Sequence, residues 1–493
     1  VVLGGIFFGA VHDYTSLFVS IREGGRSLAE VARKTLGKAG FNLFISFTII
    51  MIVLVTSSFL SATAISLTSI WPLAKIGVKE GETFLKIVVR DGVVMGRIGG
   101  IASTSVIFIT ACSPLLGFLV YKKGLKTAPT YVLALAICVT SIFLGIAYPV
   151  TLAPTTWMII ISVYVLIAAG LPVWAVLQPR DFINVQILYG GIILMVLSLF
   201  SAGFQGVKVT APVVNLAEGA RNLGFIWPMM FITIACGAIS GFHCLVAGGT
   251  TCKQVPKETD ARRIGYNAML LESVLAVCVL LALGAAVSFT DYKSVVWPVD
   301  PAVRSNPILG FSLAAGQLFH RGLGIPVALG TVFGILLVEG FVVTTLDSAV
   351  RMNRYLFEEL WTIVFKRTPR LLKPYWINSG LSVILMWVLA YSNAFNALWP
   401  IFGTANQLLA ALALLTVSAW LLLRKRKNWF TLVPAVFMVL TTLVSLGVLL
   451  GNYVQKKSYI LIAADLLLFA LAVGVLVLFV RTFIQRRIGP ASA

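Results

Sequence analysis

The sequence predicts an all-α polytopic membrane protein, and three observations support this fold class. Of the 493 residues, 59% are hydrophobic and only 11% are Asp, Glu, Lys or Arg, whereas about 25% of an ordinary soluble domain is charged. The mean hydropathy is +0.97. The apolar residues also lie in runs of the length that a helix needs to cross a bilayer, about 20 residues. These features exclude a water-soluble globular fold.

The apolar runs predict about 13 transmembrane helices. Each run must be helical, because lipid offers the backbone no hydrogen-bond partners. The approximate limits of the predicted spans are 1–21, 41–70, 98–121, 128–148, 155–177, 185–203, 225–247, 266–289, 324–347, 375–393, 397–423, 429–451 and 459–481. The chain starts inside an apolar run without an initiator methionine, so we expect it to be truncated at the N-terminus.

The basic residues predict the orientation. The net charge is +20, but the 38 Lys and Arg residues form short clusters between apolar runs, which argues against a nucleic-acid partner. If the loop after the first span is cytoplasmic, 26 of the 38 lie on the cytoplasmic side, as the positive-inside rule requires. This predicts a multi-pass protein of the cell inner membrane with a cytoplasmic C-terminus. Residues 71–97 are the exception, and we place them outside as a partly amphipathic connector.

Acidic and histidine side chains within the spans mark candidate functional positions. An ionised group in hydrocarbon is costly, so such residues usually face a polar cavity or a partner. They are His12, Asp13, His243, Glu272, Glu339, Asp465 and, at the inner end of a span, Asp347.

Glu272 and His243 are predicted to meet near the cytoplasmic mouth. They lie six and four residues from the inner ends of successive spans, or roughly 9 and 6 Å deep at about 1.5 Å per residue. A carboxyl group in an apolar wall can load and release a proton. We therefore expect Glu272 to carry a coupled proton, with His243 as its relay or as a donor to a substrate carboxylate. A static hydrogen-bonded pair is the alternative.

Two further acids are proton-coupling candidates, Asp13 and Glu339. The side chains of His12 and Asp13 point about 100° apart on a helix, so they cannot both face one cavity squarely. We expect His12 only to contact a neighbouring helix, and Asp13 is left open as a candidate for lining the pathway. Glu339 lies eight residues before Asp347, close to the same helix face, and has no partner in the sequence.

The last two acids have simpler interpretations. Asp347 lies four residues before Arg351, so we expect an intrahelical ion pair at the membrane surface. Asp465 lies in the last span, where we expect it to help assembly rather than transport.

The seventh span has the composition of a closely packed or an interrupted helix. It reads Phe231-Ile-Thr-Ile-Ala-Cys-Gly-Ala-Ile-Ser-Gly-Phe-His243 and is followed by Gly-Gly-Thr-Thr at 248–251. Free backbone N–H groups at a helix break would bind a small anion without a buried Lys. The substrate-binding candidates are Gly237, Ser240, Gly241, His243, Thr250, Thr251, Asn406 and Gln407. For the two amides, an interhelical hydrogen bond is the commoner use.

Known cofactor signatures are missing from the sequence, and we predict no cofactor other than a proton as coupling ion, with Na⁺ as the alternative. His243, Cys244 and Cys252 suggest a metal site, but their spacing matches no standard zinc pattern, and we predict none. The sequence has no phosphate-binding Gly-x-x-x-x-Gly-Lys-Ser/Thr loop, which argues against an ATP-driven pump. It has neither a His-Glu-x-x-His motif nor a Gly-x-Ser-x-Gly elbow.

Several motifs resemble the carbon starvation CstA family of membrane transporters, and they run in order over most of the chain. They are Gly9-Ala-Val-His-Asp-Tyr14 with Arg22 and Gly25-Arg-Ser27, Leu171-Pro-Val-Trp174 with Pro179-Arg-Asp181, the run 231–243 with Gly249-Thr-Thr251, Ile264-Gly-Tyr266 with Glu272-Ser273, Thr345-Leu-Asp347 with Arg351, and Leu398-Trp-Pro400 with Phe402-Gly403 and Ala405-Asn-Gln407.

The resemblance implies proton-coupled uptake of peptides or pyruvate. It also implies a LeuT-like fold of the amino acid–polyamine–organocation superfamily, with a five-plus-five inverted repeat and two broken helices. Family members begin with further helices that are missing here. We accordingly divide a single transporter domain, 1–493, into an incomplete first repeat (1–148), intervening helices (155–203), a second repeat (225–423) and two C-terminal accessory helices (429–481).

The function that we predict is a secondary active transporter that imports pyruvate or short peptides by proton symport and alternating access. A nutrient sensor with a transporter-like scaffold is the first alternative. An intramembrane enzyme using His243 and Glu272 or the thiols is the second, but it would need a nucleophile and base that the sequence does not offer. The expected partners are the small substrate and the lipid bilayer.

Overall fold

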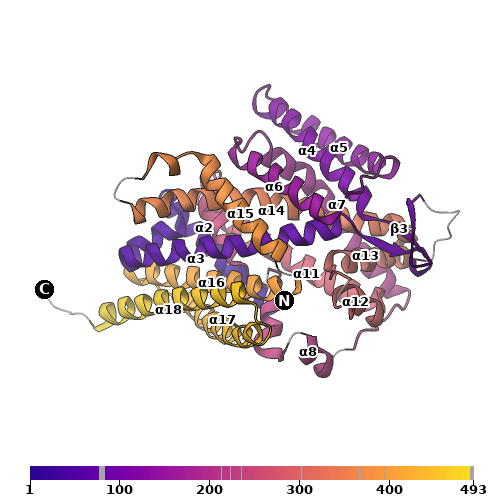
Figure 1. The fold of residues 1–493 in the computed structure, drawn as a ribbon. Helices are drawn as coiled ribbons and strands as arrows, with labels where there is room; N and C mark the ends of the chain where they lie inside the picture. The colour runs from indigo at the N-terminus through magenta and orange to yellow at the C-terminus, as the bar shows by residue number, and fades with distance from the viewer. Residues whose placement is uncertain are drawn as a thin grey trace.

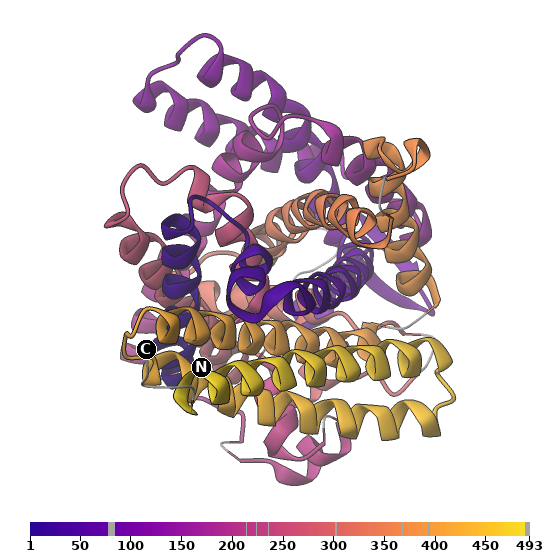
Figure 2. The same ribbon diagram turned by 90° about the vertical axis from the view of Figure 1, so that its left-hand side faces the viewer.

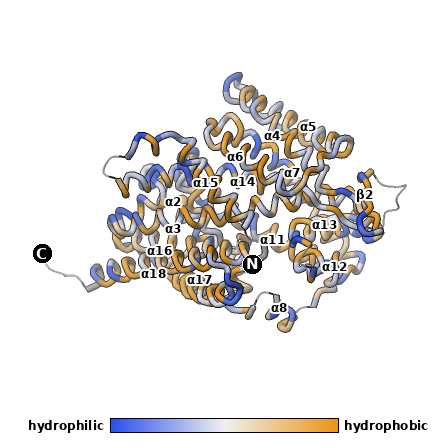
Figure 3. The backbone as a smooth tube through the Cα atoms, in the orientation of Figure 1, coloured by the Kyte–Doolittle hydropathy of each residue, from blue (hydrophilic) through white to orange (hydrophobic). Residues whose placement is uncertain are grey.

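The computed structural model describes residues 1–76, 84–212, 214–222, 224–234, 236–300, 303–365, 368–392 and 395–488. Helices form most of these ranges (Figure 1). Eleven helical spans are long and apolar enough to cross a membrane, in agreement with an all-α polytopic membrane protein. Hydrophobic residues cover most of their length, and hydrophilic stretches lie mainly near the helix ends (Figure 3).

The eleven spans coincide with eleven of the predicted ones. Val2–Arg22 combines α1 (Val2–Gly4), the π-helical turn η1 (Gly5–Gly9) and α2 (Ala10–Arg22), and Arg262–Ala286 combines η6 (Arg262–Tyr266) and α11 (Asn267–Ala286). The others are α3 (Leu28–Ser66), α4 (Gly99–Tyr121), α5 (Thr127–Ala147), α7 (Leu177–Phe204), α14 (Val327–Val364), α15 (Tyr375–Ser392), α16 (Phe395–Leu423), α17 (Trp429–Gln455) and α18 (Tyr459–Ile488).

The other two predicted spans have a different form. Helix α6 (Pro154–Gly170) is apolar but shorter than the eleven. The span predicted at 225–247 is divided into η4 (Ile226–Met230), α9 (Phe231–Thr233) and α10 (Gly241–Gly249), and the described residues between α9 and α10 are not helical. The structure thus has an interrupted helix here, and thirteen crossings remain a prediction.

A small antiparallel sheet replaces part of the predicted connector 71–97. Its strands β1 (Ile70–Pro72), β2 (Ile87–Arg90) and β3 (Val93–Arg97) have the order β1-β3-β2. Asp91 and Gly92 form the turn between β2 and β3, both with positive φ, as a two-residue hairpin turn requires. Residues 77–83 of this connector lie outside the described residues.

The shorter helices include one buried element that the predicted spans do not contain. Helix α13 (Pro307–Leu323) is mostly buried against α14, α7 and α11. The Asn306 side chain caps its start, and Gly324 ends it in the left-handed conformation. The remaining elements are η2 (Leu73–Ile76), α8 (Leu216–Asn222), η5 (Thr251–Lys253), α12 (Phe289–Val296) and η7 (Arg370–Leu372).

Helices α3, α14 and α16 form the centre of the protein. In their most apolar windows 78%, 72% and 83% of the residues are buried, against 33% in α4, α5 and α18. Helices α17 and α18 lie along one side of this centre and α4 and α5 on the opposite side (Figures 1 and 2). Polar groups on the central helices are therefore shielded from lipid, which is where a binding site can lie.

Candidate functional site

The interrupted helix is bridged by two amides of α16. The Asn406 Oδ1 atom accepts a hydrogen bond of 2.9 Å from the Phe242 backbone N–H, and its Nδ2 donates to Ser240 Oγ over 3.1 Å. The Gln407 side chain donates a 2.7 Å hydrogen bond to the carbonyl of Phe231. Helix ends leave such backbone groups unpaired, so adjacent residues of α16 satisfy one group on each side of the break.

The two predicted glycines are needed for close packing at the break. A Cβ on Gly241 would lie 2.2 Å from the Asn406 carbonyl oxygen, and one on Gly237 would lie 2.6 Å from Ala276 Cβ. The Gly237 carbonyl also accepts a hydrogen bond from Ser273 over 3.2 Å. Without side chains, the broken segment can approach α16 and α11 closely.

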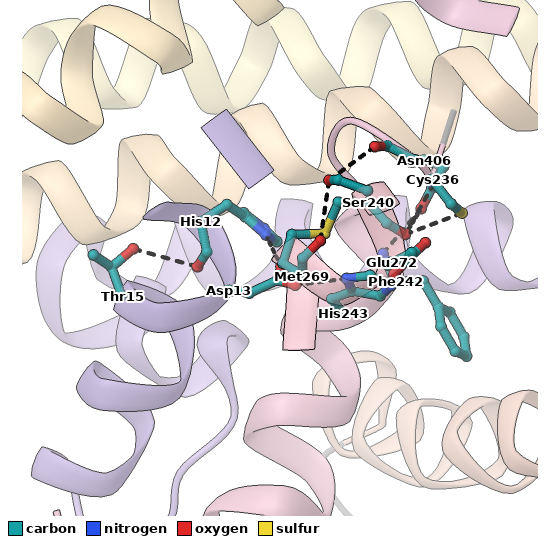
Figure 4. A network of polar contacts seen from close by, with 12 residues as sticks. His12, Asp13, Thr15, Cys236, Ser240, Phe242, His243, Met269, Glu272 and Asn406 are labelled. Atoms are coloured by element: carbon teal, nitrogen blue, oxygen red, sulfur yellow. Dashed lines mark hydrogen bonds and ion pairs between the residues drawn. The ribbon is translucent and has the colours of Figure 1, made fainter. Parts of the chain in front are cut away.

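Next to the break, four ionisable side chains form a continuous chain (Figure 4). The two carboxylate oxygens of Asp13, on α2, each lie 2.7 Å from a histidine Nδ1, one of His12 and one of His243. The Nε2 atom of His243, in the first turn of α10, lies 3.4 Å from Oε2 of Glu272 on α11. The expectation that His12 only contacts a neighbouring helix is wrong, because its ring reaches back to the adjacent carboxylate.

The chain leads from a cavity into the buried interior. The side chains of His243 and Glu272 are 27% and 32% exposed, whereas Asp13 is buried and His12 fully so. An imidazole can take a proton on one ring nitrogen and release one from the other. His243 can therefore pass a proton between Glu272 and Asp13.

The cavity has a volume of about 570 Å³ and lies among α3, α7, α10, α11, α14 and α16. Its wall is largely apolar, and its polar lining consists of Tyr189, Cys236, Ser240, His243, Glu272, Thr345 and Asn406. A site of this size, mostly apolar with a few convergent polar groups, is typical for a small molecule. A larger cavity of about 760 Å³ beside α7 and α11 has no His, Asp, Glu, Lys or Arg among its described lining residues, so we place the site in the smaller one.

Other predicted binding residues lie away from this cavity. Thr250 donates to the carbonyl of Val246 at the far end of α10, and Thr251 begins η5. Gly237, Gly241 and Gln407 border the break but are not among the described lining residues of the cavity.

The remaining acids and the thiols lie elsewhere. Glu339 is fully buried on α14, with the Ser66 hydroxyl of α3 beside it. Asp465 is buried on α18. Cys244 is fully buried and Cys252 donates to the carbonyl of Gly248. Within the described residues, no three His, Cys, Asp or Glu side chains are grouped to hold a metal ion.

Asp347 does not form the predicted pair with Arg351. It lies 2.7 Å from Arg180 on α7 and accepts a hydrogen bond of 2.9 Å from the Tyr164 hydroxyl. Arg351 instead donates to the carbonyls of Ala168 and Leu171 at the end of α6. The last carbonyls of a helix lack i+4 partners, and among the described residues only that of Ala168 has a local one, the Leu171 N–H at 3.2 Å. Arg351 satisfies these carbonyls in place of a weak intrahelical ion pair.

Arg180 is a functional candidate that the sequence analysis missed. It is one of the 26 basic residues that the sequence analysis assigns to the cytoplasmic side, but it lies in the first turn of α7 and is 1% exposed. Asp181 follows it and is also part of the group. The signal was an Arg-Asp pair directly before an apolar run, where α7 starts earlier than the span predicted at 185–203.

These features define a multi-pass membrane protein with an internal, partly polar cavity beside an interrupted helix. The chain belongs to the family of the carbon starvation protein CstA, whose family model matches residues 1–300 and 285–445. It is therefore a membrane transporter and not an enzyme.

The curated relatives carry transporter names. The chain is 29% identical to a peptide transporter CstA of Campylobacter jejuni, over 90% of this chain and 67% of that protein. It is 28% identical to the pyruvate/proton symporter BtsT of Escherichia coli, over 94% of this chain and 71% of that protein. Among solved structures, a manganese transporter of Eremococcus coleocola aligns over 97% of this chain and 95% of its own, with a TM-score of 0.40 and 12% identity. At this TM-score and identity, the structural similarity supports no conclusion about the function of the chain.

Proposed function

We propose that the protein is a secondary active transporter that imports a small carboxylate, pyruvate or a short peptide, by proton symport. The observation that supports this most is the chain His12–Asp13–His243–Glu272, which starts at the cavity and ends in the interior. The cavity of about 570 Å³ has room for pyruvate or a dipeptide, and the names of the relatives include both substrates.

Each part of the site has a role in this proposal. Glu272 takes up the proton, and His243 passes it to Asp13 or donates to the substrate carboxylate. Ser240 and Asn406, which line the cavity, bind the polar atoms of the substrate together with backbone N–H groups at the break. Gly237, Gly241 and Gln407 hold the break in shape, and Glu339 is a second buried proton acceptor.

We extend the proposal to the architecture and orientation. The interrupted helix begins the second half of an inverted repeat, 225–423, opposite an incomplete first half, 1–148, and the C-terminus lies in the cytoplasm. The interruption supports the repeat, since inverted-repeat transporters place their sites at broken helices. The cytoplasmic C-terminus is supported by the sequence count, which assigns 26 of the 38 basic residues to one side.

The test is uptake of labelled pyruvate and labelled dialanine into proteoliposomes. A proton gradient should drive accumulation of at least one of them, and a sodium gradient alone should not. Glu272→Gln should abolish gradient-driven accumulation. Asp465→Asn is the matched control, because it removes a buried acid of α18 outside the chain, and it should leave accumulation intact.

Two results would contradict the proposal. Accumulation of neither compound by the wild-type protein would refute the substrate class. Gradient-driven accumulation by Glu272→Gln at the wild-type rate would refute the proton role of Glu272. The alternative of a nutrient sensor with a transporter-like scaffold would be favoured if the protein bound these compounds in detergent but transported none of them.

A further inference from the structure

The turn between α4 and α5 carries positive charge without a nearby acid. It contains three exposed lysines, which we call the hairpin lysines: Lys122, Lys123 and Lys126. The chain has no Asp or Glu between Asp91 and Asp181, and within the described residues none of the hairpin lysines forms an ion pair. By contrast, Arg424 in another loop on the same predicted side pairs with Glu23. The charge of the hairpin lysines is therefore available to an anion.

The α4–α5 hairpin lies where lipid surrounds it. Figures 1 and 2 show these two helices at the edge of the protein, and in their most apolar windows 33% of the residues are buried. The hairpin lysines lie between the end of α4 at Tyr121 and the start of α5 at Thr127, at the boundary between hydrocarbon and headgroups. Lysines at this level on the cytoplasmic side attract anionic lipids.

A pocket of about 280 Å³ lies beside the turn, between α4, α5 and the start of α7. Its polar lining residues belong to the helix ends near the turn and are Tyr121, Thr127, Thr130, Tyr131 and Gln178. Leu116 on α4 and Phe182 on α7 line it deeper in the span, with Leu116 about 8 Å from Tyr121 along the helix axis. The pocket is thus polar near the turn and apolar toward the bilayer interior, as a phospholipid is.

Donors for a phosphate group border this pocket on two sides. On the α7 side, the Gln178 amide has no hydrogen-bond partner within the described residues. On the hairpin side, the Nζ atom of Lys122 lies 5.0 Å from the ring centre of Trp174, in the segment that leads to Gln178. Tryptophan is typical of the membrane interface, so the ammonium group lies at the depth of lipid headgroups.

We propose that this pocket binds the phosphate headgroup of an anionic phospholipid in the cytoplasmic leaflet. The hairpin lysines neutralise the phosphate, Gln178 and the Thr127 hydroxyl hydrogen-bond to its oxygens, and an acyl chain follows the apolar lining along α4. The lipid adds to the contact between hairpin and α7 that Tyr131 and Phe182 make, with ring centres 4.9 Å apart. A free phosphate ion has the same charge chemistry but would leave the apolar half of the pocket unused, which favours the lipid.

The test measures lipid binding to the purified full chain by native mass spectrometry, with thermal unfolding in detergent as a second readout. Dioctanoyl-phosphatidylglycerol should bind and raise the unfolding temperature, whereas dioctanoyl-phosphatidylcholine and inorganic phosphate should have much smaller effects. Replacing the hairpin lysines together by Gln should weaken phosphatidylglycerol binding about tenfold, because each lysine near an anionic lipid contributes severalfold. Gln178→Leu should also weaken it, although the net charge stays the same.

A matched control is the combined replacement Lys425→Gln, Arg426→Gln and Lys427→Gln. It removes the same charge from an exposed loop between α16 and α17, on the same predicted side, and should leave phosphatidylglycerol binding unchanged.

Three results would overturn the inference. Equal weakening by the two triple replacements would show a general attraction to the basic surface. Equal stabilisation by inorganic phosphate would show a site for free anions, and equal binding of phosphatidylcholine would show that the charge of the lipid is not recognised. None of these measurements involves transport, so the proposed function and this inference can fail separately.

Discussion

Two buried ionic groups lie in the interior, one at the cavity and one outside its described lining, and they differ in whether their charge can change. The first, His12, Asp13, His243 and Glu272, consists of side chains that can gain or lose a proton. The second is built on Arg180, whose guanidinium keeps its charge at any physiological pH. The difference bears on the proposed proton coupling. The first group can carry a proton, whereas the second keeps a fixed positive charge.

The largest effect that we expect comes from breaking the first group at its centre. Asp13→Asn leaves both histidines without their shared carboxylate. Gradient-driven uptake should fall about 100-fold, the scale of losing a positioned proton-transfer group. The measurement is initial uptake into proteoliposomes with and without an imposed pH gradient. Uptake that still responds fully to the gradient would place the coupled proton elsewhere.

The second prediction compares one variant in each group. Arg180→Lys keeps the positive charge of the second group, and His243→Gln removes a titratable side chain from the first. Arg180→Lys retains a cation but loses the planar fork, so uptake should drop about tenfold while its dependence on pH keeps its shape. His243→Gln should change the shape of that dependence, because it removes the imidazole between Asp13 and Glu272. Initial uptake by the two variants, measured over the same series of pH values, shows whether the two groups act independently. Identical profiles would mean that the two groups act as one.

A third ionic group, outside the spans, should affect stability without affecting coupling. Glu23 follows α2 and accepts 2.7 Å hydrogen bonds from Trp420 and Arg424, besides an ion pair with Lys34. Burial acts to raise the pKa of Glu23, but the hydrogen bonds from Lys34, Trp420 and Arg424 outweigh it and lower the pKa to about 2, from an ordinary 4.5.

The sign of the effect follows from the lowered pKa of Glu23. The stabilisation is complete above pH 4.5 and is lost as the pH falls toward 2. At pH 7, Glu23→Gln should cost about 1 to 2 kcal/mol of unfolding free energy after discounting for solvent screening. Thermal unfolding in detergent at pH 7 and pH 3 measures this, and the wild-type advantage should shrink at pH 3. An advantage that grows at pH 3 would contradict the assignment.

The smallest effect is expected at the opposite end of the protein. Lys75 in η2 lies 2.5 Å from Asp291 in α12, and both side chains are well exposed. The hydrogen bond from Lys75 is the main cause of the lowered pKa of Asp291. Lys75→Gln should change the unfolding free energy by less than about 1 kcal/mol, as surface ion pairs do. A larger loss would show that the sheet and α12 stabilise the protein beyond their local contacts.

The sequence was sufficient for the class of fold and for part of the site. Hydropathy located the eleven long spans because a helix in lipid needs a long apolar run. It did not locate α13, whose 17 residues contain Gln317, His320 and Arg321 and which is buried by other helices instead of lipid. Asp91-Gly92 between valine pairs was an overlooked hairpin signal.

Within the candidate site, the depth of a residue in the membrane was predictable from the sequence, but the direction in which its side chain points was not. Counting residues placed His243 and Glu272 at similar depths, and the structure puts them 3.4 Å apart. It could not show that Asp13, 230 positions earlier in the chain, bonds to His243, or that Asp347 turns toward α7. Local spacing suggested Arg351 as the partner of Asp347. In the folded protein Arg351 instead donates to the carbonyls at the C-terminal end of α6, and Asp347 pairs with Arg180.

The bridged break also constrains how the protein is made. Ser240 and Asn406 are 166 positions apart, and Phe231 and Gln407 are 176 apart. Until the ribosome has delivered α16, the N–H of Phe242 and the carbonyl of Phe231 lack these partners in a lipid environment that provides no others. The bridged break is therefore completed only after α16 has been synthesised, late in biosynthesis.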